Sequence, residues 1–154
     1  MGLTLEFYIG NAGKIEEAIA DVLLELLDDP TIVHKRADLS LHIDPNDLNL
    51  LSVQFGLHSG RPFLELRPFL TVLVDEEDRG LLSVDATWVD YVSNVQEKSI
   101  ATIVRDWFES MRKEHSDEDI PDPSQDVLDA VRDLITLCKD GKKRNLQVLH
   151  GWFL

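Results

Sequence analysis

The stretch LTLEFYIGNAGKIEEAIADVLLELLDDP, residues 3–30, changes its periodicity partway along. Apolar and polar residues alternate from Leu3 to Ile9, which is the pattern of a strand with one buried face, and residues 10–13 then break that strand. From Ile15 to Leu26 apolar side chains recur at helical spacing, and residues 28–30 supply two aspartates and a proline that end the helix. The apolar stripe of this helix needs a surface to cover, and neighbouring strands are the natural one.

Residues 37–89 show strand-like alternation throughout, and an antiparallel meander is the simplest arrangement of such segments. Two stretches have the composition of turns, DPND at residues 44–47 and SGRP at residues 59–62. A third polar turn is expected at residues 75–80. The predicted strands cover residues 39–43, 51–57, 64–66, 69–74 and 82–88.

The last third of the chain is predicted to be mostly helical. Asn94 and Glu97 have the spacing of a capping box, and the apolar residues of 100–111 follow on one helical face. After a polar loop, a further helix is expected from residue 122, where an Asp-Pro pair can start it, to the glycine at 141. Residues 146–154 are largely apolar and are expected to return as a strand.

These patterns predict an α+β fold in one domain over residues 1–154. The expected order of elements is β-α-β-meander-α-α-β, without an internal repeat that would indicate a solenoid. A mainly antiparallel sheet of about five to seven strands and three helices, packed on one face of the sheet, would form two layers.

Acidic residues dominate the chain. There are 29 Asp and Glu against 15 Lys and Arg in 154 residues, which gives a formal net charge of −14. The resulting negative potential repels phosphate backbones, and only the short basic runs at residues 34–36 and 142–144 oppose it. We therefore expect no nucleic-acid partner, and a basic protein is the partner that such a surface favours.

A membrane location is not expected either. The longest stretch without charge, residues 48–60, contains several polar side chains and is shorter than the roughly 18 apolar residues of a spanning helix. The first residues lack the basic and apolar regions of a signal peptide. Cys138 is the only cysteine and cannot form an internal disulfide, which suits a reducing compartment. The expected location is the cytoplasm, without a membrane partner.

Four polar residues of the predicted meander are candidates for a ligand or partner surface. Antiparallel pairing of the predicted strands would bring His42 beside Ser52, and Arg67 beside Gln54, on the face directed away from the core. Such a face is either a solvated outer surface, which antiparallel sheets commonly have, or a binding surface.

Local patterns typical of catalysis or of metal binding do not occur in the sequence. The five histidines are scattered, without the i, i+4 spacing of a helical zinc site. The acidic run at residues 75–80 has part of a calcium-loop pattern, but Arg79 stands at a ligand position. A nucleophile turn of the type Gly-x-Ser-x-Gly is missing, and Cys138 falls on an apolar helical stripe. We expect no catalytic residue, no metal and no cofactor.

Two tryptophans are further candidates for a partner surface. Trp88 and Trp152 lie near the ends of predicted strands, where a ring is either part of the core or an exposed anchor. Residues 151–154 end the chain with three bulky apolar side chains, which either dock on the domain or pack against a partner.

The function that these observations favour is a non-catalytic protein-interaction module, such as an inhibitor, an antitoxin-like protein or an adaptor, that binds a basic protein. Two alternatives stay open. One is a small-molecule-binding protein or enzyme with its site on the polar sheet face. The other is a homo-oligomer that packs through its apolar C-terminus or an open sheet edge.

Overall fold

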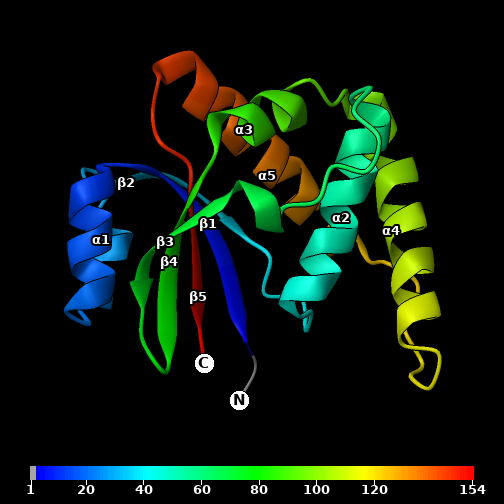
Figure 1. Cartoon of the computed structure of the whole chain (residues 1–154), viewed down its shortest axis with the longest axis horizontal. Helices are drawn as coiled ribbons and strands as arrows, with labels where there is room; N and C mark the ends of the chain where they lie inside the picture. Colours follow the sequence, from blue (N-terminus) through cyan, green and yellow to red (C-terminus); the bar gives the residue numbers. More distant parts are fainter. Residues whose placement is uncertain (1–2) are drawn as a thin grey trace.

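The computed structural model describes residues 3–154, and within them it contains one five-stranded sheet in the order β2-β1-β5-β4-β3 (Figure 1). All neighbouring strands are antiparallel. The strands are β1 (Thr4–Gly10), β2 (Val33–Asp38), β3 (Leu70–Asp75), β4 (Arg79–Val84) and β5 (Leu149–Phe153). The α-helices in the described range are α1 (Ala12–Ala20), α2 (Pro45–His58), α3 (Ala86–Ser93), α4 (Ile100–Glu114) and α5 (Gln125–Arg144). Three short 3-10 helices, η1 (Leu24–Asp28), η2 (Arg67–Phe69) and η3 (Glu97–Ser99), complete them. The predicted α+β class is confirmed, with five helices in this range where three were expected.

The last strand lies in the middle of the sheet. β5 pairs with β1 on one side and with β4 on the other, so the first and the last strand of the chain lie side by side in the sheet (Figure 1). Trp152 lies across Gly80 of β4, in the space that any side chain at position 80 would need. The apolar residues 151–153 therefore dock on the chain's own sheet, which is one of the two roles expected for them.

Both faces of the sheet carry helices. Leu5, Phe7 and Ile9 of β1 point into the larger core, which α2 to α5 cover. Tyr8 points the other way, into a second core that includes Ile15 and other residues of α1. Figure 1 shows α1 on one side of the sheet and α2, α4 and α5 on the other. The predicted two layers are therefore wrong: the molecule has three, because β1 is buried on both faces and both need cover.

The largest error in the predicted elements is α2. Residues 51–57 were expected to be a strand, yet they lie inside this helix. The DPND stretch, which has the composition of a turn, starts the helix: the Asp44 carboxylate accepts from the Asp47 amide and the Asp47 carboxylate accepts from the Asp44 amide. This capping box, with a proline at the first helical position, stabilises a helix start by about 1 kcal/mol.

Two other predicted strands are also wrong, because residues 39–43 and 64–66 form no strand, and the second strand of the chain, β2, ends at Asp38. The remaining boundaries differ less. β3, β4 and β5 confirm the predicted strands at 69–74, 82–88 and 146–154 in type, although α3 begins at Ala86 because the Asp85 side chain caps it. α4 and α5 confirm the helices predicted over 100–111 and 122–141. The first helix ends earlier than expected, at Ala20, where Val22 takes a left-handed backbone conformation with φ 57°.

No helix formed within residues 3–154 has both the length and the apolar character that crossing a membrane requires.

Candidate functional site

The four polar candidates from the predicted meander do not share a face. Ser52 and Gln54 lie on α2 and are buried, whereas Arg67 is exposed in η2 and His42 is exposed just before α2. The predicted arrangement is wrong because it needed residues 51–57 to be a strand. Ser52 has a structural partner set instead: its hydroxyl accepts from Trp88 Nε1 at 2.7 Å and donates to the Leu64 carbonyl at 2.9 Å.

The two tryptophan candidates are not free anchors. Trp88 is 1% exposed and packs between Phe7, at 6.2 Å between ring centroids, and Phe55. A partner therefore cannot reach it on the folded surface. Trp152 is half-buried against the larger core.

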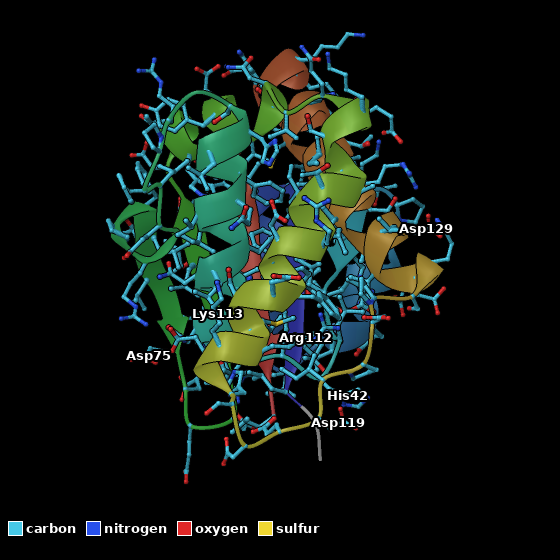
Figure 2. All side chains as sticks on the ribbon, turned by 90° about the vertical axis from the view of Figure 1, so that its right-hand side faces the viewer. His42, Asp75, Arg112, Lys113, Asp119 and Asp129 are labelled. Carbon is cyan, nitrogen blue, oxygen red and sulfur yellow. The ribbon has the colours of Figure 1, made fainter. Side chains whose placement is uncertain are left out.

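A cavity of about 850 Å³ opens where α2 begins and α4 ends. We call it the acidic cleft and define it by residues 40–47 on one wall, the last turns of α4 on the second, and residues 115–127 on the third. Figure 2 places His42 and Asp119, which both line it, at the same end of the molecule. The described residues that line it include no lysine and no arginine, but they include six carboxylates: Asp44, Asp47, Glu118, Asp119, Asp122 and Asp126.

The first wall is held by the start of α2. Asp47 is only 5% exposed, and both of its carboxylate oxygens are hydrogen-bonded, one to the Asp44 amide at 3.0 Å. Its backbone carbonyl accepts from Trp107 Nε1, on α4, at 2.8 Å. These bonds fix the first turn of α2 against α4 and set the position of the Asp44 side chain at the mouth of the cleft.

The second wall ends at His115, which follows the last residue of α4. Its Nε2 donates to Asp47 Oδ1 at 2.8 Å, and its Nδ1 lies 3.8 Å from a carboxylate oxygen of Glu118. The hydrogen bond from His115 to Asp47 raises the pKa of the imidazole above its usual value, because the charged form is the better donor. A protonated histidine also suits the negative end of the α4 dipole.

Arg112 contacts the third wall at two points. Its Nε donates to the Ile120 carbonyl at 3.2 Å and its guanidinium binds the Asp122 carboxylate at 2.8 Å. Within residues 3–154, the ion pairs involve Asp122 and Glu118 on this wall and leave Asp119 and Asp126 without a basic partner. The cleft therefore has an excess of negative charge that its own residues do not neutralise.

The side chains of Asp44, Asp47 and His115 also form a possible metal-binding set. One ligand atom from each lies within 4.8 Å of the others. All three already serve the junction between α2 and α4 through the hydrogen bonds described above, so their positions have a structural explanation.

Two other groups with potential chemistry lie inside the protein. Burial raises the pKa of the Cys138 thiol on α5, so the thiolate is disfavoured. Burial lowers the pKa of His150 to about 4, and its Nδ1–H donates to the Glu6 carbonyl at 2.9 Å while the ring stacks on Phe7. Neither group faces a cavity wall described above.

Sequence reasoning found only His42 of the cleft residues. The signals were present but ambiguous: the DPND stretch and the acid-rich residues 114–122 have the composition of solvated turns. What joins them is the contact between His115 and Asp47, which are 68 residues apart.

Comparison of the chain with protein-family models, with curated proteins and with solved structures finds no match. The acidic cleft is therefore the feature of this chain that indicates a function.

Proposed function

We propose that this protein is a non-catalytic interaction module that binds a basic segment of a protein partner in its acidic cleft. One observation carries the proposal: six carboxylates surround a cavity of about 850 Å³ whose described lining includes no lysine or arginine. A concave site lined by one sign of charge concentrates field lines and attracts the opposite charge.

The lining of the cleft suits a long cationic side chain. Ile43, Phe108, Met111 and Val127 are buried apolar residues at its base. The aliphatic stem of an arginine or lysine can pack on such a base while its charged head stays at the carboxylate rim. Arginine fits best, because its planar guanidinium binds carboxylates through two parallel hydrogen bonds.

The charge of the whole chain supports the same partner class. With a net charge of −14, the protein attracts basic proteins over a distance and repels phosphate backbones. The cleft then supplies a defined place for the contact.

The test compares two variants that each remove three carboxylates, so that both change the net charge from −14 to −11 (14 − 3 = 11). The cleft variant neutralises exposed residues of the acidic cleft: E118Q, D119N and D126N. The hairpin variant neutralises exposed residues of the turn between β3 and β4, which is taken to include the last residue of β3: D75N, E76Q and E77Q.

Titration calorimetry measures the affinity of each protein for a short peptide in which arginine alternates with glycine. Matched peptides with lysine or glutamate in place of arginine are the ligand controls. The cleft variant should bind the arginine peptide about tenfold more weakly than the natural chain, and the hairpin variant much less so. Binding should weaken as salt concentration rises. Equal losses in the two variants, or no binding of the arginine peptide, would reject the proposal.

A further inference from the structure

The loop between α2 and β3 presents an aromatic ring to solvent under backbone strain. Phe63 is 84% exposed and has φ 65°, in the left-handed region that bulky residues rarely adopt. Burial of its own ring does not compensate for this strain, since the ring is exposed. Strained backbone conformations of this kind cluster at sites that bind ligands or switch conformation.

The loop is nevertheless held firmly on α2. Leu64 and Leu66, on the C-terminal side of Phe63, are buried, and their backbones bond to the side chains of Ser52 and Asn49. Gly56 allows the close approach, because a side chain there would collide with the Arg61 carbonyl and with Leu64. Phe63 therefore projects from a fixed support.

This loop, unlike most of the chain, has more basic than acidic side chains. Residues 61–70 read RPFLELRPFL, in which Arg-Pro-Phe-Leu occurs twice and Glu65 is the single acid between two arginines. The Arg61 guanidinium lies 5.0 Å from the centroid of the Tyr91 ring, a cation–π contact that orders it. We call residues 61–69 the arginine–aromatic loop; together with Gly60 and Tyr91, most of them line a second cavity of about 550 Å³.

We infer that the arginine–aromatic loop of one copy docks in the acidic cleft of a second copy of this chain. The inference rests on the proposed function, because it requires the cleft to accept cationic segments. The loop offers two arginines, Arg61 and Arg67, to the six carboxylates of the cleft, and the exposed ring of Phe63 offers an apolar group to the apolar base of the cleft. The two surfaces are complementary in both charge and polarity.

The loop cannot occupy the cleft of its own chain. It is bound to α2 between Asn49 and Gly56, whereas the cleft opens at the first turn of α2 toward α4. The two cavities have no lining residue in common. Because the contacting surfaces differ, copies join head to tail, and each docked pair leaves one loop and one cleft free. In such an assembly the loop competes with a basic partner for the cleft.

Sedimentation velocity over a range of protein concentrations tests this arrangement with three proteins besides the natural chain. The loop variant, R61Q with F63N, removes one of the two arginines and the exposed ring, while asparagine keeps the left-handed backbone. The cleft variant and the hairpin variant are those defined above. Thermal unfolding followed by circular dichroism confirms that each one folds.

The natural chain and the hairpin variant should associate as concentration rises, and salt should weaken the association. The loop variant and the cleft variant should each have an association constant at least about tenfold lower than that of the natural chain. An equimolar mixture of these two variants should form a dimer and no larger species, since it contains one intact loop and one intact cleft per pair. A natural chain that stays monomeric, a loop or cleft variant that associates like the natural chain, or a mixture without dimers would overturn the inference.

The two proposals can fail separately. If the arginine peptide binds the cleft but the natural chain stays monomeric, the self-association inference falls and the proposed function stands. If the arginine peptide fails to bind, the proposed function falls whatever sedimentation shows.

Discussion

The acidic cleft and the turn between β3 and β4 are both rich in carboxylates but differ in shape. In the turn, Asp75, Glu76, Glu77 and Asp78 follow one another in sequence, and all four are exposed. In the cleft, six carboxylates from two separate segments, residues 40–47 and 115–127, converge on a cavity with an apolar base. Figure 2 shows Asp75 and Asp119 well apart in its view. The difference teaches that a run of acids in sequence does not by itself make a concave acidic surface, whereas acids brought together from separate segments around a cavity do.

The largest expected effect is a loss of folding stability in acid, and it comes from His150, which lies in neither the cleft nor the turn. The folded-state pKa of His150 is about 4, below the 6.5 of an unfolded histidine, so below pH 6.5 the unfolded chain binds a proton that the folded chain excludes. From pH 6.5 down to about 4 this residue should lower the free energy of unfolding by roughly 3 kcal/mol. Urea unfolding of the natural chain and of His150→Leu at several pH values measures it. If the free energy of unfolding depends on pH equally in the two proteins, the loss of stability does not come from His150. The same data give the pH range in which the protein stays folded, and the cleft and the turn are compared within that range.

The next largest effect is a difference in stability when one carboxylate is removed from the cleft or from the turn. Asp47→Ala should lower the free energy of unfolding by about 2 to 3 kcal/mol, because Asp47 belongs to the capping box and binds His115. Asp75→Ala, in the exposed turn, should change it by less than about 0.5 kcal/mol. Denaturant unfolding near neutral pH gives both values. A similar small effect for both would mean that the Asp47 contacts do not stabilise the junction.

The cleft should also respond to pH where the turn does not. The pKa of His115 is raised, whereas that of His150 is lowered, so the two histidines affect stability in opposite directions. The bond from protonated His115 to Asp47 stabilises the fold fully below pH 6.5, and this stabilisation is lost as the pH rises through the raised pKa. Asp47, Asp44 and Glu118 face this imidazole, and its protonation adds a positive charge to the cleft.

Affinity for the arginine peptide should therefore increase about two- to fivefold as His115 loses its proton. His115→Gln should remove this dependence, while His34→Gln, an exposed histidine that does not line the cleft, should keep it. Calorimetry at several pH values compares the three proteins. Persistence of the dependence in His115→Gln would assign it to another group.

The smallest effect concerns the arginine beside the rim. Arg112 binds Asp122, so Arg112→Gln should free that carboxylate and tighten arginine-peptide binding about two- to threefold. Arg105→Gln removes the same charge from an exposed site paired with Asp106, and it should change affinity less. Equal gains would show that net charge, and not the cleft, governs binding.

The type and position of an element could be predicted from the sequence where a single hydrophobic periodicity dominated. The strand at β1 and the helices α4 and α5 have unambiguous spacing, and they were predicted in the right places. α2 was missed because Leu51, Val53, Phe55 and Leu57 alternate like a strand, although Leu48, Leu51 and Phe55 also fit one helical face. The DPND stretch is chemically a turn and a helix cap at once, so local rules could not choose between them.

The cleft was beyond local rules for a different reason. It depends on tertiary contacts such as that of Trp107 with the Asp47 carbonyl, 60 residues away, and no spacing pattern encodes them. The same holds for Ser52, whose side chain was predicted to lie on the sheet face directed away from the core and is in fact enclosed between Trp88 and Leu64.

The most direct test of the central claim is a residue-by-residue map of where a cation binds. Amide chemical shifts recorded by NMR during titration with the arginine peptide provide it. Recognition in the acidic cleft predicts that the shifts change at residues 40–47 and 115–127 and stay constant at residues 75–78. Changes spread evenly over all acidic segments, or confined to the turn at 75–78, would contradict the claim that the cleft is the binding site.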